Sequence, residues 1–398
     1  MKEPTHKRKL HIELQSIVIV VNTFGRGGAE NSLAILANEL AVKGVRVTFI
    51  SLWKDKNSYD FDWISENGVK VHELNASKNF VTSSAKLFKL LSAERPNIVY
   101  SAMLYANFIS QLCCYLLGII HICTVRSNPF ELYSNNILKR ISFALIMCFQ
   151  TSIVFISHKS MNDCLISGYG WFLSKKRLFV LHNPIAVKGG VNDDYLERKI
   201  NSVKKKIKDI AAKPESECYT GDVINFVIVS RLVEGKGIIE ALEQIKIPFR
   251  NHRFHLSIFG AGPLESRIQK FINREALHDK VALKGFSFDV DQIFFDSDIL
   301  IFPSRSEGFG RVPFEGLLRG NLVLCNESVP IIKEFLNSPV GWREYSEPID
   351  LLCSVKKFSE VDPIVCRKQV NKLSAALSPN THALEFEKIA SAIMKAGK

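Results

Sequence analysis

The sequence predicts an α/β protein with two Rossmann-like, doubly wound parallel-sheet domains. Apolar, β-branched runs alternate with segments of helical period along most of the chain, as expected for a parallel sheet with helices on both faces. The runs are apolar throughout, which is typical of strands that are buried on both faces. A chain of 398 residues exceeds what one hydrophobic core usually organises, so two domains are expected. With 46% hydrophobic residues, the chain is too apolar to be disordered.

The first domain is predicted to span residues 1–186. It begins with the strand Ser16–Val21, a glycine-rich loop and the amphipathic helix Ala29–Val42, which ends at Gly44. Two later segments of helical period are Ser83–Ala93 and Tyr105–Leu117. The further predicted strands are Val45–Leu52, Val69–Glu73, Asn97–Tyr100, Ile119–Val125, Ser152–Ile156 and Phe179–Leu181.

Residues 96–125 contain no charged side chain, and their length is sufficient for a membrane-spanning helix. Polar residues interrupt this stretch, and Gly118 divides it. A buried strand, a helix and a second strand explain the same composition, and we favour that interpretation. The apolar run Ile141–Ser157 is interpreted in the same way, as a helix that leads into a strand. No spanning helix is therefore expected.

The composition changes after residue 186. Residues 187–222 have few large apolar side chains and carry a run of lysines and arginines, which we interpret as a basic linker with a charged, solvated helix. A second α/β series is predicted over residues 223–380, and a final helix in residues 381–398 is expected to cross back to the first domain. The strands of this series are Val223–Val229, Phe254–Phe259, Lys280–Lys284, Ile299–Phe302 and Leu322–Cys325.

The chain carries 52 basic and 40 acidic side chains, a net charge of +12. This balance favours a polyanionic partner, and charge alone leaves nucleic acid, anionic lipid and phosphate-bearing substrates open. The nine cysteines show no metal-binding spacing, which indicates reduced thiols in a cytosolic protein without a zinc site. The first apolar run is too short for a signal peptide.

A glycine-rich loop, residues 22–28, joins the first strand to the first helix. Gly25, Gly27 and Gly28 would let backbone N–H groups approach an anionic ligand at the helix N-terminus. The loop lacks the G-x-G-x-x-G spacing, so an ordinary tight turn explains it equally well. Glu30 fits the preference for acidic residues in a first helical turn.

Two stretches of the second domain combine cations, glycines and carboxylates after predicted strands. Arg231 and Lys236 lie on either side of Gly235 beyond the first strand, a combination that suits a diphosphate. Glu307 and Glu315 follow a later strand, with a loop and a helix start between them. Eight helical residues would span roughly 12 Å. The two carboxylates can therefore contact two parts of one extended ligand.

Taken in order, these residues resemble the retaining family-4 glycosyltransferases (glycosyl transferase group 1). That family has the GT-B fold, in which two Rossmann-like domains face a central cleft. Arg231 and Lys236 followed by Glu307-x7-Glu315 are similar to its donor site. The resemblance continues in the sequence Gly-Gly-Ala-Glu at residues 27–30, in Ser157-His158-Lys159, in Asn183-Pro184 and in residues 259–263.

The resemblance implies a nucleotide-sugar donor, and family frequency favours uridine as the base. Arg231 and Lys236 would hold the diphosphate, Glu307 would contact the donor sugar, and Glu315 would bind the ribose hydroxyls. The expected catalytic residues are Glu307, Arg231 and Lys236. The expected nucleotide-sugar site comprises Gly27, Gly28, Arg231, Lys236, Gly285, Phe286, Glu307, Gly308, Phe309, Gly310 and Glu315.

We expect neither a metal nor a cofactor. Charge grows on the departing diphosphate, and preorganised cations can stabilise it there. Arg231 and Lys236 could therefore replace a metal ion, and no DxD-like motif is positioned to hold one.

The first domain departs from the family pattern on the acceptor side. Ala102, Tyr105 and Arg126 stand in segments where many relatives carry histidines. Arg126 is a poor base because its guanidinium is always charged, but it could stabilise the departing phosphate or hold a phosphate of the acceptor. The candidate acceptor contacts are Tyr105, Asn107, Arg126 and Asn128.

The predicted activity is transfer of a hexose or N-acetylhexosamine from a nucleoside-diphosphate sugar to a saccharide hydroxyl, with retention of configuration. We expect a lipid-diphosphate-linked acceptor, a role in bacterial surface polysaccharide synthesis (O-antigen or capsule), and a cytoplasmic enzyme peripheral to the inner face of the plasma membrane. The basic linker helix and Lys86, Lys89, Lys139 and Arg140 are candidate contacts with that surface. The alternatives are a sugar-nucleotide epimerase of the same architecture and a catalytically decayed polyanion-binding protein. No nucleic-acid-binding motif is found.

Overall fold

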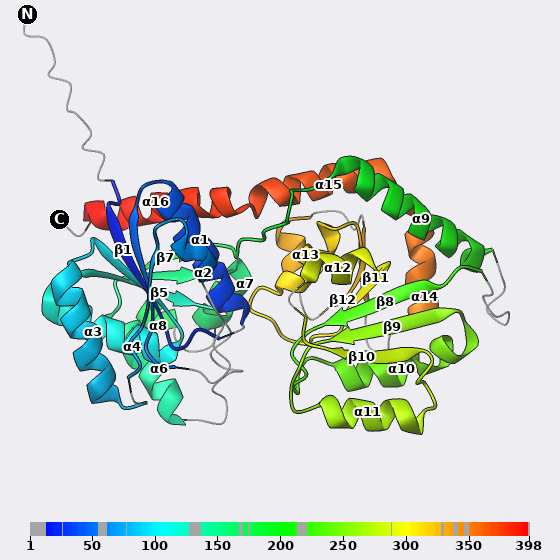
Figure 1. The fold of residues 1–398 in the computed structure, drawn as a ribbon, viewed down its shortest axis with the longest axis horizontal. Helices are drawn as coiled ribbons and strands as arrows, with labels where there is room; N and C mark the ends of the chain where they lie inside the picture. Colours follow the sequence, from blue (N-terminus) through cyan, green and yellow to red (C-terminus); the bar gives the residue numbers. More distant parts are fainter. Residues whose placement is uncertain are drawn as a thin grey trace, which may run out of the picture. The chain divides into compact units, whose positions relative to one another are not determined.

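The structure is a computed structural model. It describes residues 13–25, 27–54, 62–76, 78–126, 137–166, 170–173, 176–212, 221–287, 289–327, 330–336, 341–345 and 350–396. The chain divides into two compact units: unit 1 comprises residues 1–184 and 377–398, and unit 2 comprises residues 185–376. Each unit contains one parallel sheet with helices packed on it (Figure 1). The prediction of two doubly wound α/β domains is confirmed.

The described part of unit 1 forms a seven-stranded parallel sheet in the order β3-β2-β1-β4-β5-β6-β7. The chain starts at β1, moves outward to β3, and returns to place β4 beside β1. This reversal creates a switch point at the carboxyl ends of β1 and β4, where ligands bind in such sheets. The strands are β1 (Ser16–Val21), β2 (Arg46–Ser51), β3 (Lys70–Glu73), β4 (Ile98–Ala102), β5 (Ile120–Val125), β6 (Ser152–Phe155) and β7 (Arg177–Val180).

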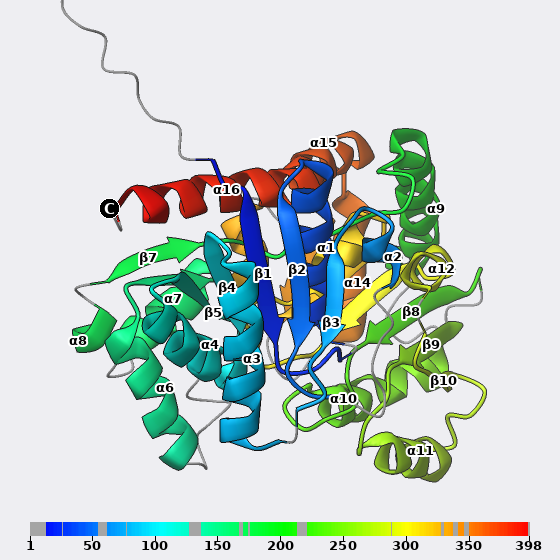
Figure 2. The same cartoon turned by 60° about the vertical axis from the view of Figure 1, so that its left-hand side comes forward.

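Helices cover both faces of the unit 1 sheet. One face packs on α1 (Gly28–Val42), α2 (Asp62–Ser65) and α16 (Pro379–Ala396). The other packs on α3 (Phe80–Glu94), α4 (Leu104–Leu117) and α6 (Ile137–Phe149). Within this layer α3 and α4 lie side by side (Figure 2). The short helices α7 (His158–Cys164) and α8 (Gly170–Leu173) complete the described part of the unit.

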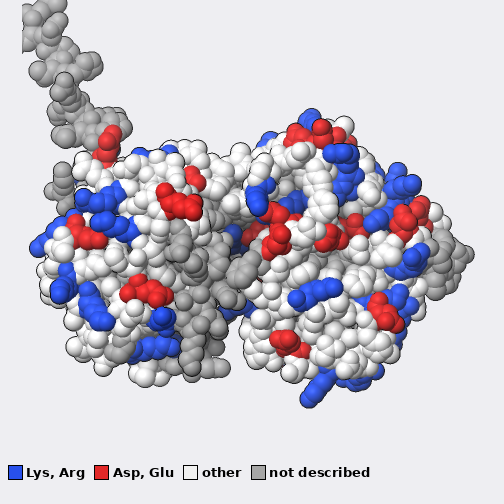
Figure 3. Space-filling model, viewed as in Figure 1, with Lys and Arg blue, Asp and Glu red and all other residues white. Residues whose placement is uncertain are grey.

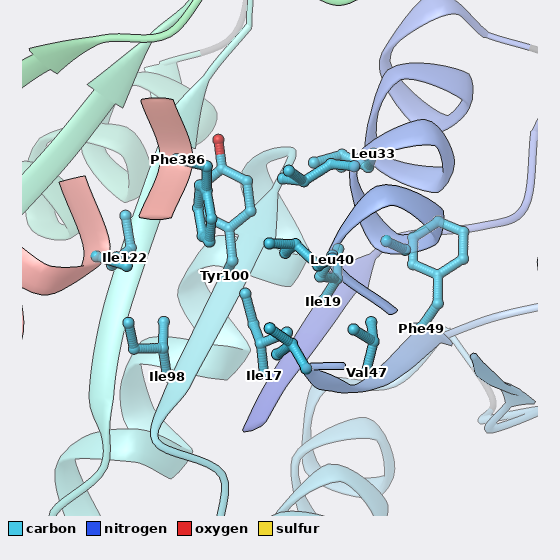
Figure 4. Close-up of a cluster of buried hydrophobic side chains, with 14 of the residues drawn as sticks. Ile17, Ile19, Leu33, Leu40, Val47, Phe49, Ile98, Tyr100, Ile122 and Phe386 are labelled. Carbon is cyan, nitrogen blue, oxygen red and sulfur yellow. The ribbon is translucent and has the colours of Figure 1, made fainter. Parts of the chain in front are cut away.

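The C-terminal helix α16 belongs to the core of unit 1. Its Phe386 ring lies 4.9 Å from the ring of Tyr100 on β4, between centroids. Figure 4 shows this contact within one apolar cluster, to which β1, β2, β4, β5, α1 and α16 contribute side chains. Residues far apart in sequence therefore share one core, and α16 contributes to its stability.

The charge-free residues 96–125 fold as β4, α4 and β5, which confirms the strand–helix–strand interpretation. Gly118, at a φ of 66°, ends α4 in the left-handed conformation that glycine adopts without strain. Across the described residues, no helix combines the length and apolar character needed to cross a membrane.

The described part of unit 2 forms a six-stranded parallel sheet in the order β10-β9-β8-β11-β12-β13. Its strands are β8 (Ile224–Val229), β9 (Phe254–Phe259), β10 (Val281–Gly285), β11 (Ile299–Phe302), β12 (Leu322–Asn326) and β13 (Trp342–Tyr345). The sequence did not predict β13, an edge strand whose central residues are charged and half-buried. The other strands lie where they were predicted, with small differences at their ends.

The helices of unit 2 include one that was predicted as a solvated linker. They are α9 (Asp193–Ala211), α10 (Ile238–Asn251), α11 (Glu265–Arg274), α12 (Val290–Phe295), α13 (Arg311–Leu317), α14 (Leu351–Lys356) and α15 (Pro363–Ala376), with 3₁₀ turns η2 (Pro330–Glu334) and η3 (Lys357–Glu360). The linker helix is α9, which packs against α14, α15 and η3. It buries Leu196, Ile200, Val203 and Ile207, so it is a structural part of unit 2.

Several lysines of α9 hydrogen-bond within unit 2. Lys206 forms an ion pair with Asp298 at 3.0 Å, and Lys204 donates to the carbonyl oxygen of Val361 at 2.7 Å. Lys199 donates to the carbonyl oxygens of Phe294 and Arg319 and to the side chain of Asn321. Elsewhere, basic and acidic side chains are interspersed on the face of each unit seen in Figure 3. Part of the basic composition of the chain therefore serves contacts within unit 2 and is not available to a partner.

We expect Lys199→Met to lower the free energy of unfolding by about 1–3 kcal/mol, because it leaves buried carbonyl groups without a donor. Burial lowers the pKa of Lys199 to about 7, and this cost of removing the ammonium from water limits the net loss. Urea unfolding measures the change. Lys205→Met, at an exposed position of the same helix, is the control and should have little effect. Equal losses in both variants would contradict this role for Lys199.

Candidate functional site

The candidate donor site lies at one edge of the unit 2 sheet. The strands β8, β9, β10 and β11 are parallel, so the loops that follow them meet at their carboxyl ends. These loops are residues 230–237 after β8, 260–264 after β9, 286–289 after β10 and 303–310 after β11, with residue 288 outside the described part. They carry every site residue that the sequence predicts in the second domain, except Gly285, the last residue of β10, and Glu315 on α13.

Backbone hydrogen bonds join these loops to one another. The N–H of Leu232 donates to the carbonyl oxygen of Ala261 at 2.9 Å, and the N–H of Gly260 donates to that of Gly285 at 2.8 Å. The N–H of Arg305 donates to the carbonyl oxygen of Gly235 at 3.3 Å. The loops therefore form one connected surface, on which side chains from different strands have fixed positions.

Three glycines are required for this packing of loop on loop. A Cβ atom on Gly237 would overlap the carbonyl oxygen of Pro303, and one on Gly260 would overlap that of Ser230. Gly262 approaches the backbone of Leu232 in the same way. The sequence interpretation connected Arg231, Gly235 and Lys236 with a diphosphate, and the structure gives the neighbouring Gly237 a packing role.

Lys236 and Glu307 form an ion pair across the loops after β8 and β11. Lys236 Nζ donates to Glu307 Oε1 at 2.5 Å, and the two side chains are 14% and 19% exposed. Two predicted catalytic groups therefore lie in contact. Because both charges are largely removed from water, each depends on the other for compensation.

Arg231 and Glu315 lie on either side of this pair in the sequence, in different surroundings. The Arg231 side chain is exposed, and no ion pair to it is found among the described residues of unit 2. Glu315 accepts from Arg311 at 3.1 Å, one turn earlier on α13, and both side chains are largely buried. The sequence interpretation assigned no role to Arg311, although its i,i+4 spacing from Glu315 is the signal for such a pair.

The glycine loop before α13 is anchored by an aromatic cluster. Phe309 is buried, and its ring lies 5.2 Å from that of Phe314 and 6.2 Å from that of Phe335, between centroids. Its side chain therefore belongs to the core, and only the backbone of Gly308, Phe309 and Gly310 is available to contact a ligand. Beyond β10, Gly285 has a φ of 69°, and the Phe286 side chain that follows is exposed.

In unit 1, the loop between β1 and α1 contains Gly27 and Gly28. The carboxylate of Glu30 folds back against Gly25 and Gly27, at positions where a Cβ atom on Gly27 would overlap it. Glu30 is buried, so it does more than favour the first helical turn. The Glu30 carboxylate therefore explains why Gly25 and Gly27 lack side chains, without any bound anion.

The predicted acceptor contacts differ in accessibility. Tyr105 is exposed on α4, and its ring lies 5.2 Å from that of Trp53, between centroids. Arg126 directly follows β5 and donates to the side chain of Asn183. Asn107 is 4% exposed. Asn128 lies outside the described residues.

Asn107 takes part in a buried polar network that the sequence did not reveal. Ser101 donates to Asn107 at 2.7 Å, so the Ser101 oxygen accepts from Nε2 of His121, and Gln150 then donates to Nδ1 of that ring. Burial lowers the pKa of His121 to about 3, which keeps it neutral. The network fixes α4 on β4 and β5, and no local pattern links residues so distant in sequence.

Met103, at the carboxyl end of β4, has a φ of 77°, a conformation that costs a non-glycine residue about 1–3 kcal/mol. Such strain clusters at functional sites, and this residue lies at the switch point between β1 and β4. Within the described ranges of the chain, no three His, Cys, Asp or Glu side chains gather as metal ligands would.

Comparison with known proteins identifies the class to which this fold and these loops belong. The model of Glycosyltransferase Family 4 matches residues 26–188, and that of Glycosyl transferases group 1 matches residues 211–344. The fold is GT-B, as predicted, and the protein is a glycosyltransferase. The chain belongs to the group 1 glycosyltransferases and has the family 4 domain in its N-terminal half.

Individual relatives are distant. The O-antigen biosynthesis glycosyltransferase WclY of Escherichia coli is 22% identical over 330 residues, which cover 79% of this chain and 86% of that protein. The Anabaena Alr3699/HepE structure in complex with UDP and glucose aligns with a TM-score of 0.70 at 15% identity, over 95% of this chain and 100% of that one. A glycosyltransferase structure from Rickettsia africae ESF-5 aligns with a TM-score of 0.67 at 18% identity, over 96% of this chain and 99% of that one.

The loop packing predicts that Gly237→Ala is more harmful than Gly235→Ala. Both glycines have a positive φ, of 67° and 82°, so each alanine adds strain of about 1–2 kcal/mol. Only Gly237 faces a carbonyl oxygen, whereas nothing lies within 4 Å of a Cβ atom on Gly235. Urea unfolding should show a clearly larger loss of stability for Gly237→Ala. Similar losses in both variants would refute the loop contact.

Proposed function

We propose that the protein transfers a hexose or N-acetylhexosamine from a UDP-sugar to a hydroxyl of a saccharide acceptor, with retention of configuration. The observation that carries the proposal is the Lys236–Glu307 pair at the meeting point of the loops after β8 and β11. It unites a phosphate-binding cation and a sugar-binding carboxylate at the edge where ligands bind in such sheets. The UDP and glucose in the Anabaena structure support uridine as the base.

In the proposed reaction, the bond between the anomeric carbon and the donor phosphate breaks as the acceptor oxygen bonds to that carbon. The electron pair leaves with the diphosphate, and the acceptor proton passes to a leaving phosphate oxygen on the same face. Arg231 and Lys236 stabilise the growing negative charge. Backbone N–H groups of residues 308–310 add donors beside them.

The two carboxylates have separate roles in this proposal. Glu307 accepts hydrogen bonds from hydroxyls of the donor sugar once a phosphate has become the partner of Lys236. Glu315, oriented by Arg311 at 3.1 Å, accepts from the ribose hydroxyls. Phe286, exposed beyond β10, lies where the base would be read mainly by backbone.

The acceptor is proposed to be a saccharide linked to a lipid diphosphate, in O-antigen or capsule synthesis at the cytoplasmic face of a membrane. The O-antigen assignment of WclY supports this setting. Arg126, which follows the carboxyl end of β5 and donates to Asn183, is proposed to contact the acceptor phosphate. Tyr105, exposed on α4, can contact the saccharide, whereas Asn107 acts through the network that holds α4.

Nucleotide binding separates these roles. We expect UDP, and not GDP, ADP or CMP, to raise the melting temperature of the purified protein, because a ligand at one hundred times its Kd adds about 2.7 kcal/mol. Arg231→Gln and Glu315→Ala should remove most of this shift. Arg198→Gln, at an exposed arginine of α9 in the same unit, should keep it. Absence of a shift with every nucleotide would contradict the donor site.

Glu307→Gln should retain UDP binding but lower turnover by about 100-fold or more, because the carboxylate acts on the sugar. Glu265→Gln, at an exposed position of α11, is the control and should leave turnover unchanged. Full turnover in Glu307→Gln would refute this assignment. Production of an epimerised sugar nucleotide without any acceptor would instead indicate the epimerase.

Transfer is proposed to need no metal ion, since Arg231 and Lys236 supply the positive charge at the diphosphate. Turnover in excess EDTA should equal turnover without it, and Lys236→Gln should lower turnover in both conditions. Activity that is lost in EDTA and restored by Mg²⁺ or Mn²⁺ would refute this part of the mechanism.

A further inference from the structure

The outer surface of α4 and α6 in unit 1 is apolar although it faces solvent. On α6, Phe143, Ile146 and Met147 pack on the sheet, while a second apolar stripe recurs at helical spacing on the opposite side. The exposed residues are Ile137, Leu138, Ile141, Leu145 and Phe149 on α6, and Leu112, Tyr115 and Leu116 on the neighbouring α4. We refer to these eight residues as the α4–α6 face. Contiguous exposed apolar surface of this kind marks an interaction site.

The charge around the α4–α6 face is positive. Residues 96–162 contain a single acidic side chain. Lys139 and Arg140 lie on α6, and Lys176 and Arg177 lie at the start of β7. An apolar helical face with basic and almost no acidic neighbours is complementary to an anionic lipid surface. A protein partner of mixed charge would not require this depletion of acids.

A cavity of about 810 Å³ continues the α4–α6 face into unit 1. Its lining includes Leu112, Tyr115, Leu145 and Phe149 of the face, together with the first residues of β5, β6 and β7. Sites for small organic ligands typically have volumes of about 300–1,000 Å³. The cavity is therefore large enough for part of a lipid.

The cavity is distinct from the candidate acceptor site. His121, Ser152 and Arg177 line it, and each stands at or next to the amino end of its strand. Arg126, in contrast, follows the carboxyl end of β5. In a parallel sheet these are opposite edges, so a ligand in the cavity would not occupy the site of transfer.

Two polar groups indicate which ligand the cavity suits. The hydroxyl of Ser152, a fully buried residue, and the side-chain nitrogen of Gln111 have no hydrogen-bond partner within the described residues. Buried polar groups nearly always form hydrogen bonds, so a purely apolar ligand would leave both groups without a partner, at a cost in free energy. An amphiphile with oxygen atoms beside an apolar chain would satisfy them.

We propose that unit 1 docks on an anionic lipid bilayer through the α4–α6 face, and that one acyl chain of an anionic glycerolipid enters the cavity. Ester oxygens of the lipid accept from Gln111 and Ser152, and its phosphate lies near Arg177, since Lys176 donates to the carbonyl oxygen of Cys148 at 2.8 Å. Lys86, an earlier candidate for membrane contact, donates to the carbonyl oxygens of Leu74 and Asn75 instead. The inference rests on the proposed function only in its choice of partner, since a lipid-linked acceptor brings the enzyme to such a surface.

Vesicle flotation tests the docking surface. The wild-type protein should float with vesicles of phosphatidylcholine and phosphatidylglycerol, and not with phosphatidylcholine alone. The double variant Ile141→Glu/Leu145→Glu should bind these vesicles with an affinity that is lower by about tenfold or more, because charges replace side chains that would enter lipid. Ile364→Glu on α15 is the matched control, since Ile364 and Ile141 are both 51% exposed, and it should float like the wild type.

Two flotation results would overturn the docking proposal: equal binding to neutral vesicles, and unchanged binding of the double variant. A wild-type protein that does not float, and that forms a stable dimer in solution, would overturn it as well. In the last case the α4–α6 face would be an interface between copies of this chain.

Binding of a monomeric lipid tests the cavity. Dioctanoyl phosphatidylglycerol below its critical micelle concentration should bind the wild-type protein at one molecule per chain in isothermal titration calorimetry. Gln111→Trp, which fills the cavity, should weaken this binding about tenfold or more, and Ile364→Trp should not. No saturable binding to the wild type would overturn the lipid site. Neither assay contains a sugar nucleotide, so failure here leaves the proposed transfer untouched, and failure of transfer leaves lipid binding measurable.

Discussion

The parallel pairing of β8 with β11 is the constraint on which the candidate donor site depends. It brings the ends of two strands to one edge, so Lys236 and Glu307, 71 residues apart in sequence, form an ion pair at 2.5 Å. A largely buried pair of this kind is costly to break by removing one partner, but either charge can exchange its partner for a ligand group. In the proposed reaction a phosphate oxygen takes over Lys236, which frees the carboxylate to accept from the sugar. The same contact thus holds the loops together and prepares them for the donor.

The class of fold and most strands could be predicted from the sequence, because buried parallel strands produce apolar runs and the loops after them concentrate glycines and charges. Residues 96–125 are the clearest case, since their strands and helix follow from apolar period and one dividing glycine. The edge strand β13 could not be predicted, because its central residues, Arg343 and Glu344, give no apolar run. The ion pair between Lys236 and Glu307 could not be predicted either, because a motif indicates which residues belong to a site but not which of them are in contact.

Glycines illustrate how one pattern can have two causes. The sequence interpretation connected Gly235, which lies close to Gly237 in the loop after β8, and the glycines of the β1–α1 loop with a nearby anion. In the structure, Gly237 avoids the Pro303 carbonyl oxygen and Gly27 accommodates the carboxylate of Glu30. Both causes require the same absence of a side chain, so sequence alone could not separate them. Only the atoms around each Cα in the folded protein show whether a glycine leaves space for a ligand or for another loop.

Net charge requires the same distinction. The lysine run of α9 accounts for much of the basic composition near the predicted linker, yet Lys199, Lys204 and Lys206 donate to groups within unit 2. Long aliphatic stems allow lysine to pack along apolar surface while its ammonium reaches an internal carbonyl group, so a charge run need not form a solvated face. The cations proposed to meet phosphate groups lie instead at strand ends: Arg231 and Lys236 in unit 2 and, in unit 1, Arg126 at one edge and Arg177 at the other. A parallel sheet has two edges, and the proposed acceptor site and the proposed lipid site of unit 1 lie at opposite ones.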